Sequence, residues 1–115
     1  MCGLFGGASL NLSMSEKTAI HELGVVSQLR GVDSTGIATC SREKKARRRY
    51  TIIKDTEAAG EFMLYSTVRS ALSDSSLLSI IGHCRAATVG EVNISNAHPH
   101  RYGDIIGVHN GTINK

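Results

Sequence analysis

The sequence contains no tryptophan and few aromatic residues of any kind, which together make up 4% of its 115 residues. The core of such a chain must rest on isoleucine, leucine, valine and alanine, with glycine allowing close packing. Hydrophobic residues make up 41% of the chain and charged residues 20%, which excludes an intrinsically disordered protein. The length fits one domain with a single core, spanning residues 1–115.

Long apolar runs and paired cysteine motifs are also missing. The longest apolar stretches, such as LLSII at residues 77–81, are far shorter than the ~20 residues that cross a bilayer. The N-terminus lacks the basic start and apolar stretch of a secretory signal. Three cysteines form an odd set without a CxxC pair. These features predict reduced thiols in the cytoplasm and no membrane association.

The positive charge is concentrated in one place. The net charge is +3, and the run REKKARRR at residues 42–49 carries most of the excess. Only Tyr50 stands beside this run, without the interleaved aromatics of nucleic-acid-binding surfaces. It therefore predicts an exposed hairpin tip and no nucleic-acid partner. His98, His100 and His109 have no compact zinc-site spacing, so no metal is expected.

The first half of the chain alternates between strand and helix patterns. Residues 2–8 predict a short, buried strand, and SMSE at residues 13–16 has the spacing of a capping box that begins a helix. We expect that helix to end near Leu29. Two β-rich runs on either side of the basic stretch predict a hairpin. The apolar residues expected on the buried face of the helix are Ala19, Ile20, Leu23 and Val26.

The second half predicts one more helix and two buried strands. Asp55 or Thr56 is expected to cap the helix. Continuous apolar runs at residues 77–84 and 103–110 are typical of strands buried on both faces, and the polar segment between them is expected to be irregular. The order predicts an α+β fold with helices layered over sheet. The expected apolar stripe of the second helix is Ala58, Phe62, Tyr65, Val68 and Leu72.

Reactive residues gather at the ends of three predicted strands, where layered folds often place their chemistry. A cysteine nucleophile requires a base, an oxyanion hole and a means of holding its substrate. Removal of Met1 would give Cys2 an α-amine with a pKa of ~7.7–8.0, which can serve as the base for the thiol. Asn110 and Gly111 offer two donors for an oxyanion, and Arg85 offers a bidentate fork for a carboxylate. The plainer alternatives are a buried thiol and an ion-pairing arginine.

Five sequence blocks occur in one order along the chain: MCGLFGG, RGVDSTG, GHCRAATVG, NAHPH and VHNGTI. Together they resemble the class II glutamine amidotransferase domains, which are N-terminal-nucleophile (Ntn) hydrolases. NAHPH and VHNG are most similar to the glutaminase half of glucosamine-6-phosphate synthases. The resemblance extends from Cys2 to Ile113. It implies an αββα layered sandwich, incomplete or minimal, and a glutamine substrate without a cofactor.

The resemblance also implies the catalytic roles. Cys2 would attack the side-chain amide of glutamine, release ammonia and leave a γ-glutamyl thioester that water hydrolyses. Asn110 and Gly111 would form the oxyanion hole.

Further residues are implied in substrate binding and support. Arg85 would bind the α-carboxylate of glutamine, with Thr88 beside it in the same loop. Arg30, followed by Gly31, would pack against the nucleophile and orient its amine. His98 would support the pocket and is not expected to be the base.

The chain departs from the family pattern in three ways. Ala86 stands where a tryptophan is usual, and Val89 where a histidine is frequent. The acidic residue that pairs with the substrate ammonium normally follows in a later segment, so Glu91, Asp104 or a second chain would have to replace it. A natural minimal form, a fragment, and a half completed by another copy or a synthase subunit are the alternatives for a chain that ends at Lys115.

These departures leave two further interpretations open. One is a degenerate amidotransferase-like module that binds a partner or glutamine without turnover. The other is an Ntn hydrolase acting on a different amide.

Overall fold

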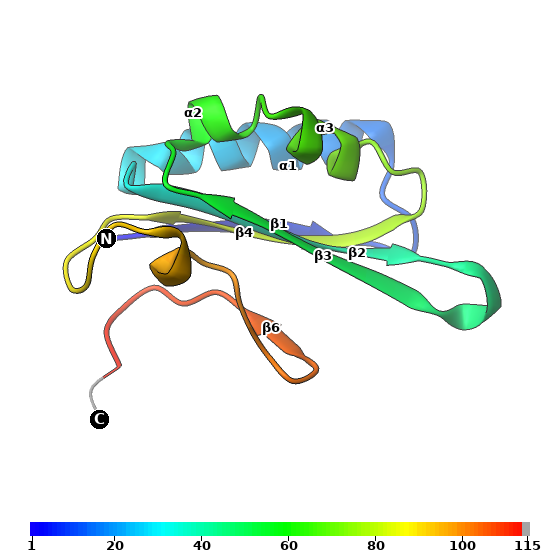
Figure 1. Ribbon diagram of the computed structural model, residues 1–115. Helices are drawn as coiled ribbons and strands as arrows, with labels where there is room; N and C mark the ends of the chain where they lie inside the picture. Colours follow the sequence, from blue (N-terminus) through cyan, green and yellow to red (C-terminus); the bar gives the residue numbers. More distant parts are fainter. Residues whose placement is uncertain (114–115) are drawn as a thin grey trace.

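The computed structural model describes residues 1–113, which form a mixed α+β fold (Figure 1). A four-stranded antiparallel sheet has the order β1-β4-β2-β3, and a separate hairpin pairs β5 with β6. The helices cover one face of the sheet, and the segment after β4 runs along the opposite side. The elements are β1 Gly3–Ala8, α1 Met14–Ser27, β2 Ser34–Arg42, β3 Arg48–Asp55, α2 Ala59–Phe62, α3 Ser66–Leu72, β4 Leu77–Arg85, β5 His100–Tyr102 and β6 Ile105–Gly107, with short 3-10 helices at Gln28–Arg30, Lys44–Ala46 and Ile94–Asn96.

The predicted capping box begins α1. The Ser13 hydroxyl accepts a hydrogen bond from the Glu16 backbone N–H at 3.2 Å, and the Glu16 carboxylate accepts one from the Ser13 N–H at 2.9 Å. The helix ends at Ser27, and the chain continues as a 3-10 turn to Arg30. This start and end agree with the sequence pattern.

The buried face of α1 differs from the prediction. Leu23 and Val26 are 52% and 60% exposed, whereas Ile20 and Gly24 are buried. A Cβ at Gly24 would lie 3.0 Å from the Phe5 ring. The missing side chain therefore lets the helix approach β1 along its Gly24 face, which turns the Leu23 and Val26 face toward solvent. The expected stripe was therefore correct for Ile20 and wrong for Ala19, Leu23 and Val26.

The second predicted helix is broken into α2 and α3. Neither has a side-chain cap, and their N-caps are Ala58 and Tyr65. Asp55 is instead the last residue of β3 and accepts a hydrogen bond from the Tyr65 hydroxyl at 3.1 Å. The predicted cap was therefore wrong. The expected stripe largely faces the core, since Phe62, Val68 and Leu72 are buried.

The core lies between the helices and the sheet and is largely aliphatic, as the composition predicts. Gly82 on β4 leaves the space into which the Phe5 ring of β1 packs, because a Cβ there would collide with that ring. The central members of the cluster are Phe5, Ile20, Ile37, Phe62, Met63, Val68, Leu77 and Ile80.

The end of the described chain differs from its prediction. The apolar run at residues 103–110 forms only the three-residue β6, and Ile105 is 71% exposed. Its partner β5 lies in the segment expected to be irregular. Within residues 1–113 this hairpin pairs only with itself, so the expectation of a strand buried on both faces was wrong.

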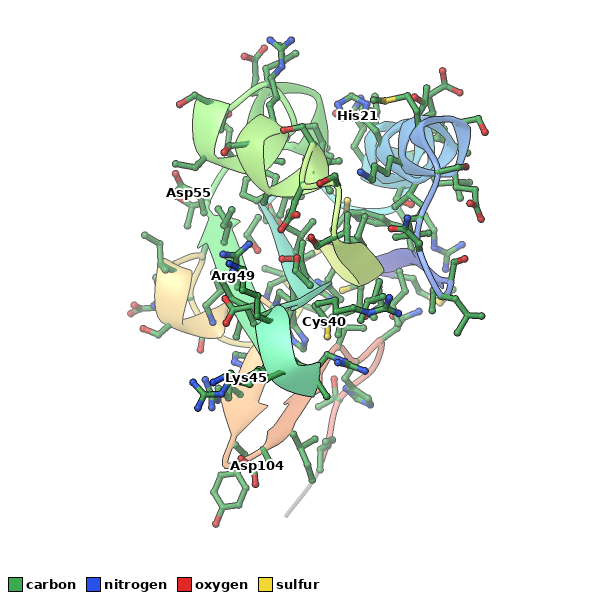
Figure 2. The ribbon with its side chains drawn as sticks, turned by 90° about the vertical axis from the view of Figure 1, so that its right-hand side faces the viewer. His21, Cys40, Lys45, Arg49, Asp55 and Asp104 are labelled. Carbon is green, nitrogen blue, oxygen red and sulfur yellow. The ribbon has the colours of Figure 1, made fainter. Side chains whose placement is uncertain are left out.

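The basic run forms the tip of the β2–β3 hairpin, as predicted, and the tip extends beyond the helical layer (Figure 1). Figure 2 shows Lys45 at this tip and Arg49 above it, on β3. Arg49 pairs with Asp74 at 2.7 Å and with Glu43 at 3.5 Å.

Candidate functional site

Cys2 lies immediately before β1, and the register of the sheet places it beside the end of β4. Gly3 pairs with Cys84, so Cys2 faces the residues that follow Cys84. The backbone N–H of Ala86 donates to Sγ of Cys2 at 3.4 Å, and Sγ lies 3.7 Å from the Ala86 carbonyl oxygen. The thiol is partly buried. It is therefore held at a strand end with access to a cleft.

Asn110 approaches Cys2 from the other end of the described chain. The Cys2 backbone N–H donates to Oδ1 of Asn110 at 3.2 Å, across 108 residues of sequence. Because the carboxamide oxygen accepts this bond, its nitrogen Nδ2 points elsewhere and remains a donor. The next residue, Gly111, has a φ of +140°, a conformation that side chains disfavour. Both residues are exposed at the cleft.

Arg30 and Gly31 lie against the nucleophile candidate and the end of β4. Nε of Arg30 donates to the Cys2 carbonyl oxygen at 2.9 Å. A Cβ at Gly31 would collide with the Arg85 backbone. The start of the RGVDSTG block therefore contacts Cys2 through Arg30 and the end of β4 through Gly31.

Arg85 is the last residue of β4 and is 7% exposed. Its Nη1 donates to the Glu91 carbonyl oxygen at 2.7 Å and its Nη2 to that of Val89 at 2.8 Å. The loop after β4 is thus wrapped around the guanidinium. A guanidinium has five N–H donors, so these two bonds leave further donors for a ligand. Thr88 stands exposed on the same loop.

Asp33 fixes the start of that loop, a role that the sequence analysis missed. Its Oδ2 accepts a hydrogen bond from the Ala87 N–H at 2.7 Å, and its own N–H donates to the Arg85 carbonyl oxygen at 3.0 Å. Its partners lie more than 50 positions further along the chain, so no local signal could have identified them.

Three histidines form a stack beside the cleft. The rings of His83 and His98 have centroids 4.1 Å apart with 13° between their planes, and His100 tilts against His98 at 4.4 Å. Burial, together with the neighbouring cationic groups, lowers the pKa of His98 to about 4 and also lowers the pKa of His83. His98 is therefore neutral near pH 7. His83 was not singled out from the sequence.

Most of the predicted site residues line one cleft. Glu91 and Asp104, the candidate partners for a substrate ammonium, are not among the residues that line it. Asp104 lines a different cavity, which includes Cys40, between the sheet and the β5–β6 hairpin (Figure 2). The Glu91 side chain is exposed, and its carboxylate lies 3.4 Å from Nδ2 of Asn93. The predicted residues that line the cleft are Cys2, Arg85, Thr88, His98, Asn110 and Gly111.

Two further observations on the described residues concern metal ions and membranes. Within residues 1–113, no three histidine, cysteine, aspartate or glutamate side chains gather closely enough to bind a metal ion. The helices of the same residues are too short or too polar to span a bilayer.

Comparison with known proteins relates the chain to one kind of enzyme. It is 35% identical over 117 aligned positions to a glutamine–fructose-6-phosphate aminotransferase (isomerizing) of Caulobacter vibrioides, with 98% of this chain and 17% of that protein covered. It is 32% identical to the Acinetobacter baylyi enzyme of that name and 34% identical to a probable one of Acanthamoeba polyphaga mimivirus, again over 98% of the chain.

The chain is a homologue of these aminotransferases. This confirms the resemblance to glutamine amidotransferases that the five sequence blocks indicated. The chain spans 16–18% of the length of these three relatives. No protein-family model matches it.

Proposed function

We propose that this chain is the glutamine-hydrolysing part of a class II amidotransferase, with Cys2 as its N-terminal nucleophile. The observation that carries the proposal is the contact between the Cys2 nitrogen and Oδ1 of Asn110, 3.2 Å across 108 residues. It brings a thiol, its own nitrogen and an amide-bearing turn into one cleft. An ordinary buried thiol requires no such neighbour.

Removal of Met1 would convert the Cys2 nitrogen into the base. Met1 is 78% exposed, so the bond to Cys2 is accessible to an aminopeptidase. The freed amine, with a pKa of ~7.7–8.0, is partly unprotonated at neutral pH. It would accept the thiol proton directly or through one water. The same nitrogen would keep Oδ1 of Asn110 as its acceptor.

The reaction would proceed in two steps. Sγ of Cys2 attacks the side-chain carbonyl carbon of glutamine as the α-amine accepts the thiol proton. The amine then passes this proton to the amide nitrogen, the C–N bond breaks, and ammonia leaves. Water then attacks the γ-glutamyl thioester and gives glutamate and the free thiol. Nδ2 of Asn110 and the N–H of Gly111 would stabilise both oxyanions, each donor lowering the barrier by ~2.7–4 kcal/mol when well aimed.

The remaining cleft residues would hold the substrate and the nucleophile. Arg85 would bind the α-carboxylate through the donors that the loop carbonyls leave free, with Thr88 beside it. Arg30 would fix the Cys2 carbonyl and so orient the amine. His98 would support the pocket as a neutral ring, since its pKa of about 4 keeps it uncharged.

Completion of the site would come from elsewhere. The homologues are named for a reaction between glutamine and fructose-6-phosphate, and we extend only the glutamine half to this chain. If the chain is a fragment, a further segment of the same protein would supply an ammonia acceptor, a partner for the substrate ammonium and the layers that complete an αββα Ntn sandwich. Otherwise a synthase subunit or a second copy would supply them. Reduced Cys2, Cys40 and Cys84 suit the cytoplasm.

One observation favours the alternative of a module that binds without turnover. Both terminal nitrogens of Arg85 already donate to the Val89 and Glu91 carbonyls, so the loop partly occupies the proposed carboxylate site. Such a module would bind glutamine or a partner and release no ammonia.

One experiment separates these functions. Intact mass spectrometry, before and after incubation with an electrophilic glutamine analogue, reports both the loss of Met1 and labelling at Cys2. Ammonia release from glutamine is measured on the same sample, with Cys2→Ala as the control. Labelling and turnover that both disappear in Cys2→Ala support the proposal. Stabilisation by glutamine without either supports the binding module, and retention of Met1 in active protein overturns the mechanism.

A further inference from the structure

Both backbone groups of His109, the residue before Asn110, are bonded to imidazole rings. Nε2 of His83 lies 3.0 Å from the His109 carbonyl oxygen, and the His109 N–H donates to Nδ1 of His98 at 3.3 Å. The two rings that make these bonds are stacked on each other. His109, which leads into the Asn110–Gly111 turn, is thus held at its backbone N–H and at its carbonyl oxygen by one histidine pair.

We propose that His83 and His98 act together as positioning residues that set the Asn110–Gly111 turn against Cys2. This inference rests on the proposed function, because the turn would be the oxyanion hole. A displacement of about 1 Å in a site of this kind can reduce turnover about 100-fold. The rings would act through His109 and would not contact glutamine in order to do so.

The two bonds fix the tautomer of each ring. A carbonyl oxygen only accepts, so His83 must carry its proton on Nε2. A backbone N–H only donates, so Nδ1 of His98 must be unprotonated and its proton must lie on Nε2. The His83 side chain is 1% exposed, and its Nδ1 has no partner within the described residues. A proton added to Nδ1 would therefore be a buried donor without an acceptor, which favours the neutral ring.

The pair is anchored to the sheet. His83 lies on central strand β4, where it pairs with Gly36 of β2. A Cβ at Gly36 would collide with the His98 carbonyl oxygen, so this glycine lets the 97–99 segment lie directly on the strand. Nζ of Lys54 donates to the carbonyls on either side of His98, to Ala97 at 2.8 Å and to Pro99 at 3.1 Å. The His98 backbone therefore has a rigid base.

The required atoms can be tested by amide substitutions that place a polar group at one ring position. The Gln side-chain nitrogen reaches roughly the position of Nε2, and the Asn oxygen roughly that of Nδ1. At His83, where a donor at Nε2 is required, Gln should retain at least tenfold more glutaminase kcat than Asn. At His98, where an acceptor at Nδ1 is required, Asn should exceed Gln by a similar factor. KM for glutamine should change less than kcat in all four variants.

A purely structural role would give the same order of variants at both positions, since each pair loses the same stacking contact. The proposal is overturned if the Gln and Asn variants have equal kcat at either position, or if their order is the reverse of the expected one. The fold of each variant is checked by its thermal unfolding, and a variant that does not fold is replaced in the comparison by the measurements on wild-type protein below.

A second readout does not depend on catalysis. In the wild-type chain, long-range ¹H–¹⁵N spectra should show both His83 and His98 protonated on Nε2 alone at pH 7. Exchange of the His109 amide should accelerate at least tenfold in His98→Gln relative to His98→Asn. An Nδ1-protonated His83, or equal exchange in the two variants, overturns the inference even where turnover is absent. Absence of glutaminase activity with the expected tautomers would contradict only the proposed function.

Discussion

Asp33 lies immediately before β2, and its carboxylate accepts a hydrogen bond from the backbone N–H of Ala87 at 2.7 Å. The preceding residue, Ala86, is the one whose N–H donates to Sγ of Cys2. Asp33 thereby connects the loop that carries Thr88 to the start of β2, the strand that pairs with β4. This single side chain controls where the loop leaves the sheet, although it does not line the cleft.

Replacement of Asp33 by alanine should therefore loosen the loop after β4. The Ala87 N–H would lose its acceptor, which should lower the free energy of unfolding by about 1–3 kcal/mol. Glutaminase activity should fall with it, because Ala86 would be less firmly held against the thiol. Chemical denaturation and initial rates measure the two effects.

Asp33→Asn is the matched control, because its side-chain oxygen can still accept the Ala87 N–H. It should lose less than half of the stability that Asp33→Ala loses. If the two variants were equally destabilised, the charge of Asp33 and not its hydrogen bond would be the important property.

The next prediction concerns the two polar atoms of the Asn110 carboxamide. Oδ1 faces the Cys2 nitrogen, whereas Nδ2 is the proposed oxyanion donor. Asn110→Ala should lower kcat about 10²–10³-fold with a smaller change in KM, which is the effect of losing one oxyanion donor. Asn110→Asp keeps an oxygen for the Cys2 nitrogen but loses the donor and adds a charge, so it should lose at least as much.

These effects are measured as kcat and KM for glutamine, with wild-type and variant proteins that begin at Cys2. An Asn110→Asp variant with nearly full kcat would mean that the contact to the Cys2 nitrogen is sufficient and that Nδ2 does not stabilise the oxyanion.

Local patterns in the sequence predicted the elements that local interactions determine. The capping box at Ser13 and Glu16 involves residues three positions apart, and the β2–β3 hairpin joins neighbouring segments. Both were predicted correctly. The buried face of α1 also depends on how Gly24 packs against the Phe5 ring, which is distant in sequence. Periodicity alone therefore identified Ile20 but placed Leu23 and Val26 on the wrong side.

In the candidate site, too, some residues could be predicted from local patterns and others could not. Cys2, Arg85 and Asn110 stand in recognisable sequence blocks, so their presence could be predicted, and the structure brings them to one cleft. Asp33 and His83 reach partners 54 and 26 positions away. Their contacts depend on the pairing of β2 with β4 and on the path of the segment after β4, which no short pattern encodes.

A substitution at Gly36 tests how closely the segment after β4 lies on β2. A Cβ there would collide with the His98 carbonyl oxygen and come within 2.8 Å of Cβ of Lys54. Gly36→Ala should therefore displace the 97–99 segment and destabilise the fold by about 1–3 kcal/mol, the usual effect of overpacking. Gly107→Ala is the control, because no heavy atom lies within 4 Å of the added methyl. It should change stability by less than about 0.5 kcal/mol. Equal effects of the two substitutions on the thermal unfolding midpoint would contradict the predicted close contact.

The histidine stack predicts how stability depends on pH. Burial lowers the pKa of His98 from its ordinary 6.5 to about 4 and also lowers the pKa of His83 and of His100, with Arg85 nearby opposing a further charge on each. Below pH 6.5 the unfolded chain therefore binds protons that the folded chain does not, so the free energy of unfolding should fall as the pH drops from 6.5 toward 4. At about 1.4 kcal/mol per pKa unit, His98 contributes at most about 3 kcal/mol, reduced by its partial exposure. Urea unfolding at steps between pH 7 and pH 4 measures the slope. His98→Asn, which cannot titrate, should flatten it, and an unchanged slope in that variant would mean that other groups carry the pH dependence.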